Sequence, residues 1–131
     1  MTDFFSKSDL SRKDAENIVS ETLHACDDGE LYLENSKSES ILLDDNKIKN
    51  SSYSADLGYG LRAITGDVVA YSHSNEISNS SLKKSSENLC STLKSKKGIY
   101  NNEIPKTNKK LYKNINPIEE KSLNSKLELL K

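Results

Sequence analysis

Between residues 39 and 72, apolar side chains recur at every second position, and turn-forming residues separate the apolar runs. A period of two is the spacing of a β-strand that buries one face. In the run Gly58–Thr65, one face carries Tyr59, Leu61 and Ala63. The following Gly66 supplies the positive-φ position of a tight hairpin, so Val68–Tyr71 is predicted to return as the partner strand.

Three further runs extend this pattern toward the N-terminus. Ser40–Leu43 and Lys47–Tyr53 flank Asp44-Asp45-Asn46, whose side chains can bond to their own backbone in a turn. Glu30–Asn35 is a shorter run that alternates in the same way. Together the runs predict an antiparallel meander sheet of about four to five strands with short connections.

Helix signals precede the first strand. Ser11 lies three residues before Asp14, which is the spacing of a capping box. A helix is therefore predicted from about Arg12 to Asp27, and Gly29 is expected to end it. The apolar spacing of this segment predicts one buried face, formed by Ala15, Ile18, Val19, Thr22, Leu23 and Cys26.

A second helix is predicted from about Asn79 to Lys94, with Ser78 as its cap. Its inward face is thin and contains small polar residues. The members of this face are Leu82, Ser86, Leu89, Cys90 and Leu93. Both helices are expected to pack on one face of the sheet, which gives an α+β fold.

The C-terminal part shows a weaker pattern. Residues 95–116 are polar and basic, which indicates a linker. Asn116-Pro117 is typical of a helix start, and the helix would carry an apolar stripe of Leu123, Leu127 and Leu130. It reaches Lys131 without a stop signal, which favours a chain that is cut short. The predicted organisation is an α+β domain at 1–94, a linker at 95–116 and a truncated amphipathic helix at 117–131.

Composition narrows the function classes. The 131 residues suit one domain, and an apolar fraction of 34% allows a modest core. A net charge of −1 gives no field that would attract nucleic acid or anionic lipid, and lysine clusters such as Lys83-Lys84 are typical of solvated surface. No apolar run approaches the roughly 20 residues that span a bilayer. The N-terminus lacks a secretory signal, so a cytoplasmic location, without membrane or direct nucleic-acid binding, is expected.

Titratable residues form no catalytic or metal-binding pattern. His24 has only Asp28 at helical spacing, and His73 has no clustered ligand beside it in the sequence. Cys26 and Cys90 both fall on predicted core faces, where an inert thiol is the common case. We therefore assign no catalytic, cofactor-binding or metal-ligating residue.

The strand region contains two features that a core alone does not explain. Gly58, Gly60 and Gly66 are not followed by a helix or a Lys-Ser/Thr pair, so they are not a phosphate loop; they are typical of strand edges and hairpins, where a backbone can approach closely. Arg62 is a charge within an otherwise apolar strand. Its side chain faces solvent, pairs with a carboxylate or contacts a partner.

The same region resembles a known family. The matching segments are Glu30–Leu33, Asp45–Lys49, Ser52–Ser54, Gly58–Gly66, Ala70–Ser72 and Ile77-Ser78. They are similar to the pattern G-S-Y-x-x-D-x-G-x-G-x-R-A-x-S-G in the N-terminal domain of the TldD/PmbA family of zinc-dependent peptidases. Asp56 takes the Asp position, whereas Ser51 stands for the first Gly and Thr65 for the Ser. Leu111-Tyr112 and Asn116-Pro117 resemble the TldD branch rather than the PmbA branch.

The resemblance implies an α+β N-terminal domain within a much longer chain, whose C-terminal domain holds zinc on an H-E-x-x-x-H helix. It also implies TldD–PmbA heterodimers that act on unfolded or leader peptides, and a link to modulation of DNA gyrase. This sequence contains no H-E-x-x-x-H. None of those catalytic residues can therefore be transferred to it, and no cofactor is expected in this chain.

Three hypotheses follow. In the first, the chain is the N-terminal fragment of a TldD-like metallopeptidase, inactive alone, which needs a C-terminal metallopeptidase chain or a PmbA-like subunit. In the second, it is a non-enzymatic domain that binds a partner or a peptide strand, with Arg62, Tyr53, Gly58 and Gly60 as contact residues. In the third, it is a non-functional remnant of a split gene.

Overall fold

The computed structural model describes residues 4–93, 98–99, 111–113 and 115–131. The helices and strands in chain order are α1 (Arg12–Leu23), β1 (Asp28–Asp44), β2 (Lys47–Thr65), β3 (Val68–Ser74), α2 (Asn79–Leu93) and α3 (Leu123–Leu130). The chain divides into two compact units. The core unit comprises residues 2–35 and 57–105, and the ribbon unit comprises residues 36–56 and 106–131.

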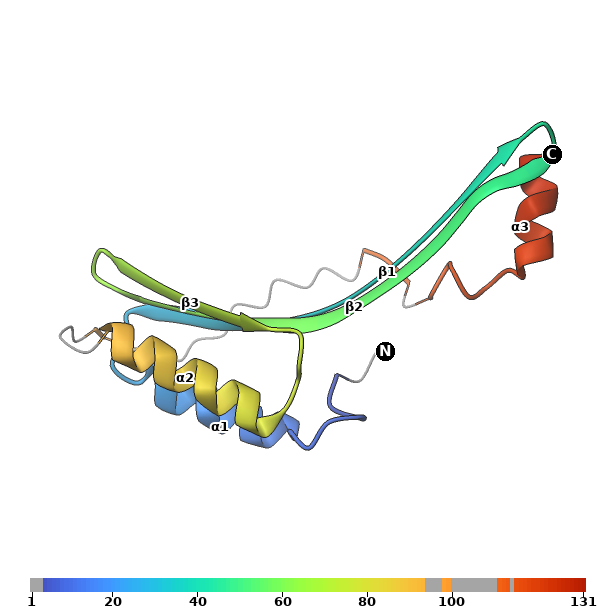
Figure 1. The fold of residues 1–131 in the computed structure, drawn as a ribbon. Helices are drawn as coiled ribbons and strands as arrows, with labels where there is room; N and C mark the ends of the chain where they lie inside the picture. The colour runs from blue at the N-terminus through green and yellow to red at the C-terminus, as the bar shows by residue number, and fades with distance from the viewer. Residues whose placement is uncertain (1–3, 94–97, 100–110, 114) are drawn as a thin grey trace. The chain divides into compact units, whose positions relative to one another are not determined.

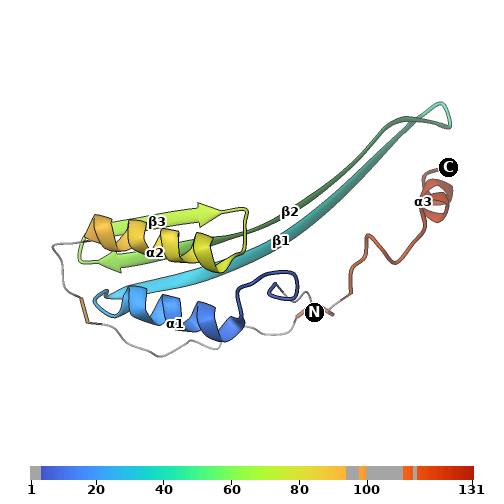
Figure 2. The ribbon, with the colours of Figure 1, turned by 60° about the horizontal axis from the view of Figure 1, so that its bottom comes forward.

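In the core unit, α1 and α2 cover the same face of the sheet (Figure 1). The two helices lie side by side, and α2 runs along β3 (Figure 2). The largest fully buried side chains come from the N-terminal segment, α1, β2 and α2: Leu10, Leu23, Leu61, Leu82, Leu89 and Thr65. The predicted α+β fold, with two helices on one face of an antiparallel sheet, is confirmed.

Within the described residues the sheet has three strands in the order β1-β2-β3, rather than about four to five. The runs predicted as separate strands merge: Glu30–Asn35 and Ser40–Leu43 both lie in β1. Likewise, Lys47–Tyr53 and Gly58–Thr65 both lie in β2. No proline or glycine separates either pair of runs, so nothing in the sequence forces the extended backbone to turn.

Both predicted turns are confirmed. Asp45 and Asn46 have φ of 50° and 56°, so the β1–β2 connection has positive φ at both central positions, as a type I′ hairpin requires. Asp and Asn tolerate this region better than other non-glycine residues. Gly66, with φ of 57°, is the first of the two turn residues in the second hairpin, where Thr65 pairs with Val68.

Helix α1 begins as predicted but ends earlier. The Ser11 hydroxyl accepts the backbone N–H of Asp14 at 3.1 Å, which confirms the cap. The helix ends at Leu23 instead of Asp27, because the N–H of Asp27 already donates to the Ile64 carbonyl of β2 at 2.8 Å. The prediction that Gly29 ends this helix is therefore wrong. Gly29 lies inside β1.

Helix α2 spans the predicted segment, and the Ser78 hydroxyl accepts the N–H of Ser81 at 3.2 Å. Its buried stripe is Leu82, Ser85, Leu89 and Leu93. The prediction that Cys90 belongs to this stripe is wrong, because Cys90 lies about 100° around the helix from Leu89 and is exposed. Cys26, in contrast, is buried as predicted.

The ribbon unit contains the β1–β2 hairpin tip and α3. α3 begins at Leu123 with Ser122 as its cap, and not at Pro117 as predicted. Its predicted apolar stripe packs little, since no residue of α3 is buried among the described residues. The hairpin and the C-terminal segment instead meet through charges: Lys126 bonds the Glu39 carboxylate, and Lys37 bonds Glu119 at 2.7 Å. This hydrogen bond lowers the pKa of Glu119 and raises that of Lys37.

Most of the predicted linker, residues 95–116, lies outside the described residues. Its described positions, 98–99, 111–113 and 115–116, carry neither helix nor strand. The division into segments 1–94, 95–116 and 117–131 stays a prediction. Of the helices among the described residues, none is long and apolar enough to cross a membrane.

Candidate functional site

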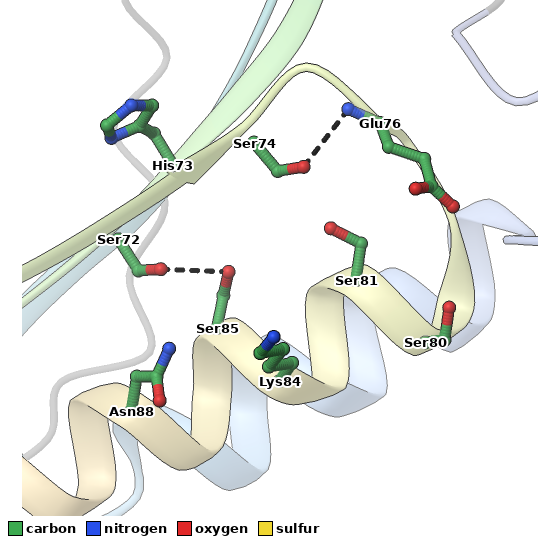
Figure 3. A pocket seen from close by; sticks show the side chains of 9 residues that line it. All are labelled: Ser72, His73, Ser74, Glu76, Ser80, Ser81, Lys84, Ser85 and Asn88. Carbon is green, nitrogen blue, oxygen red and sulfur yellow. Dashed lines mark hydrogen bonds between the residues drawn. The ribbon is translucent and has the colours of Figure 1, made fainter.

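An open pocket of about 410 Å³ lies in the core unit between β3 and α2. Its β3 side is formed by Ser72, His73 and Ser74, and its helix side by Ser80, Ser81, Lys84, Ser85 and Asn88. Figure 3 shows Asn88 at one end of this lining and Glu76 at the other. The pocket therefore offers hydroxyl, amide, ammonium and carboxylate groups, which suit a polar ligand.

Hydroxyl groups of the lining belong to a hydrogen-bonded chain that also includes Tyr59 of β2. The Tyr59 hydroxyl lies 2.9 Å from both the Ser81 and the Ser85 hydroxyl oxygens. The Ser72 hydroxyl donates to Ser85 at 3.0 Å (Figure 3). Tyr59 is only 5% exposed and Ser85 is buried, so these bonds satisfy polar groups that have little access to water. They also fix the lining of the pocket to the central strand.

Sequence reasoning missed this pocket. The signal was the spacing of Ser81, Ser85 and Asn88, which places polar groups along one side of a helix. A second signal was Tyr59 on the predicted buried face, because a buried tyrosine hydroxyl needs a hydrogen-bond partner. Neither signal shows from sequence that β3 would supply the opposite wall.

The predicted contact residues fall in two different units. Arg62, Gly58 and Gly60 lie on the part of β2 that belongs to the core unit, whereas Tyr53 lies in the ribbon unit and is exposed. Arg62 pairs with Glu30 at 3.0 Å, so it takes the carboxylate pairing that the sequence left open. Its Nε atom is buried and has no hydrogen-bond partner among the described residues. A role for these four residues in binding stays a prediction.

The candidate metal ligands and nucleophiles are dispersed. His24 is exposed at the C-terminal end of α1, and His73 is exposed on β3, where its ring stacks on Tyr71. The part of the chain that the structure describes contains no group of three or more His, Cys, Asp or Glu side chains that could hold a metal ion. The described residues therefore do not fit a zinc site.

Asp27 joins three segments of the core unit. Its carboxylate accepts the backbone N–H of Gly66 at 2.7 Å and that of Ile99 at 3.0 Å. A nearby backbone bond runs from the Gly98 N–H to the Ala25 carbonyl at 2.7 Å. Hydrogen bonds from Gly66 and Ile99 stabilise the ionised carboxylate and so lower the pKa of Asp27.

We expect Asp27→Asn to destabilise the core unit at neutral pH and to lose this effect in acid. Because the pKa of Asp27 is lower in the folded chain than its ordinary 3.8, its stabilising contribution is complete above that pH and disappears as pH falls through the lowered value. Urea unfolding of wild type and variant between pH 7 and roughly pH 2 measures this.

Asp28→Asn is the matched control, because it removes the neighbouring carboxylate and leaves both bonds of Asp27 in place. A stability difference between Asp27→Asn and wild type that stays constant down to the lowest pH would contradict the assigned role of the Asp27 carboxylate.

The sequence is similar to a known protein family and to several known proteins. A family described as "PmbA/TldA metallopeptidase domain 1" matches residues 29–93, which run from β1 to the end of α2. A "Metalloprotease TldD homolog" from Buchnera aphidicola subsp. Acyrthosiphon pisum (strain APS) is 36% identical over 105 residues, which cover 79% of this chain and 22% of the relative.

Two further relatives carry the same description. The one from Haemophilus influenzae (strain ATCC 51907 / DSM 11121 / KW20 / Rd) is 31% identical over 130 residues, covering 94% of this chain and 26% of the relative. The one from Buchnera aphidicola subsp. Schizaphis graminum (strain Sg) is 28% identical over 127 residues, which cover 95% of this chain and 26% of the relative. The chain thus spans about a quarter of the length of the relatives it matches.

Proposed function

This chain belongs to the TldD/PmbA family through a first domain of that family at residues 29–93, and we propose that it contributes this domain to peptide hydrolysis by a TldD-like metallopeptidase. The supporting observation is the extent of the match, which covers the three strands and α2 of the described residues together with both hairpin turns. The zinc-binding and catalytic groups of such an enzyme belong to a further domain. The chain is inactive without it.

The sequence and structure support this division of labour. The sequence holds no H-E-x-x-x-H, and the described side chains do not group around a possible metal position. The relatives named as metalloproteases are about four times as long as the matched segment. A second polypeptide or a longer form of this chain supplies the zinc domain, and a PmbA-like subunit completes the assembly that cleaves unfolded or leader peptides.

We expect the isolated chain to contain far less than one zinc ion per molecule and to leave an unfolded peptide intact. Addition of a polypeptide with the remaining part of a TldD-like relative should produce cleavage faster than that polypeptide gives alone. Elemental analysis by mass spectrometry and chromatography of the peptide products measure the two quantities. Stoichiometric zinc in the isolated chain, or a mixture no faster than the added polypeptide, would contradict the proposal.

A second function is favoured by the pocket and the strand beside it. β3 is the last strand of the sheet, and the pocket beside it is polar and open. A sheet edge next to a pocket is the arrangement by which several domain types bind an extended peptide. We therefore propose that this domain also binds a polypeptide segment, with or without the catalytic domain.

A further inference from the structure

The outer edge of β3 presents free backbone groups. The residues next to a two-residue turn, here Thr65 and Val68, exchange both backbone hydrogen bonds, and such pairs alternate along an antiparallel ladder. The register therefore turns the backbones of Val68, Ala70, Ser72 and Ser74 toward β2. The N–H and C=O groups of the intervening residues point away from β2; these residues are Val69, Tyr71 and His73.

This edge lacks the features by which proteins usually prevent strand pairing. β3 has seven residues without a proline, a lysine or an acidic residue, and no described strand pairs with its outer side. Val69 and Tyr71 are exposed on the face opposite the helices, and His73 stacks on Tyr71. An unprotected edge of this kind is a template for another strand.

The pocket determines which side chains an added strand can carry. On a strand paired with β3, every second side chain would lie on the helix side, over the lining formed by Ser81, Lys84 and Asn88. Among the described residues, the Lys84 ammonium group has no ion-pair or hydrogen-bond partner. A carboxylate arriving there would gain both the charge of Lys84 and hydroxyl donors.

A second copy that pairs through its own β3 does not meet this requirement. Another β3 would bring Ala70, Ser72 or Ser74 to the helix side, since these are the side chains that face the helices. None of them carries a charge, so such a dimer would gain no ion pair with Lys84, which is an exposed side chain. The lining also holds Glu76, so the preference for a different polypeptide with an acidic side chain is confined to the position beside Lys84.

We propose that the outer edge of β3 binds an extended polypeptide segment by strand addition, with an Asp or Glu side chain of that segment seated in the pocket beside Lys84. The segment forms backbone hydrogen bonds with Val69, Tyr71 and His73. This proposal rests on the binding role proposed above, and it requires no zinc domain.

The test uses the full chain and a blocked, fluorescently labelled peptide of about nine residues, in which Thr and Val alternate around one central Asp. A matched peptide carries Asn in place of Asp. We expect fluorescence anisotropy to show about tenfold tighter binding of the Asp peptide, the ordinary effect of one charge-assisted hydrogen bond. Lys84→Gln should abolish this preference, whereas Lys83→Gln, which removes an exposed lysine outside the pocket, should keep it.

Backbone pairing is tested on the peptide, so that the fold of the protein is untouched. N-methylation of alternate residues on one edge of the peptide should abolish binding, and N-methylation on the other edge should leave it. Three results would overturn the proposal: no binding at millimolar peptide, equal affinity for the Asp and Asn peptides, or equal effects of Lys83→Gln and Lys84→Gln. A dimer in sedimentation that peptide fails to dissociate would overturn it as well.

These titrations contain no catalytic domain, so their outcome is separate from that of the cleavage experiment. Peptide binding without reconstituted cleavage would contradict the hydrolytic function alone. Reconstituted cleavage by a chain that binds neither peptide would contradict the proposal for the β3 edge alone.

Discussion

Replacing Leu61 by Ala should lower the free energy of unfolding of the core unit by about 2–5 kcal/mol. Leu61 lies on β2, the central strand, and its side chain is 0% exposed beneath the helices. The substitution removes buried apolar surface and leaves a cavity that its neighbours fill only in part. Because small domains are stable by only about 5–15 kcal/mol, a loss of this size removes a large share of the free energy of unfolding. Urea denaturation followed by circular dichroism measures it.

Leu57→Ala is the matched control. Leu57 lies on the same strand and in the same unit, but its side chain is 42% exposed. The same atoms are deleted, yet no closed cavity results, so the expected loss is below about 1 kcal/mol. Equal losses at the two positions would show that the helices do not enclose Leu61 as described.

Gly58→Ala should lower the stability of the core unit by about 1–3 kcal/mol, because its new methyl group meets backbone. A Cβ atom at position 58 would lie 2.7 Å from the carbonyl oxygen of Ser74 on the neighbouring strand. A backbone carbonyl held in a sheet cannot move away without weakening the ladder. The measurement is again the urea midpoint, with circular dichroism to confirm that the sheet is retained.

Gly60→Ala gives the comparison, two residues further along β2. A Cβ atom there would lie 2.6 Å from the hydroxyl oxygen of Tyr71, which ends an exposed side chain that can rotate away. Alanine also restricts the unfolded chain, so the net change should stay within about 1 kcal/mol. Gly58 and Gly60 were both predicted as contacts for a partner. If Gly60→Ala proved as destabilising as Gly58→Ala, the steric argument for Gly58 would be wrong.

Local signals in the sequence predicted the local structure well. Gly66 and the pair Asp45-Asn46 located both hairpins, because few residues accept positive φ. Ser11 located the start of α1 through its hydroxyl. The alternation of Tyr59, Leu61 and Ala63 identified the face that the helices cover. Each of these signals acts over a few residues, which is why a single sequence reveals it.

The features that the sequence misplaced or did not reveal depend on packing between distant segments. Cys90 and Ser85 both border the apolar stripe of α2, and only the position of β3 and Tyr59 makes Ser85 the buried one. The pocket likewise forms only where β3 and α2 meet. The hydrogen bonds of the Asp27 carboxylate require Gly66 and Ile99, which are far away in sequence. Periodicity indicates which side of an element is apolar. It does not indicate what lies across from its polar side.

The uneven distribution of buried residues has a thermodynamic consequence. Every buried side chain among the described residues belongs to the core unit, whereas residues 36–56 and α3 contain none. The heat capacity of unfolding arises mainly from apolar surface that becomes hydrated, so it reflects the core unit and falls below what 131 residues would give if uniformly packed. We therefore expect the hairpin tip to open as a subglobal fluctuation, at a free energy well below that of global unfolding. A single melting temperature describes only the part of this chain that is packed between helices and sheet.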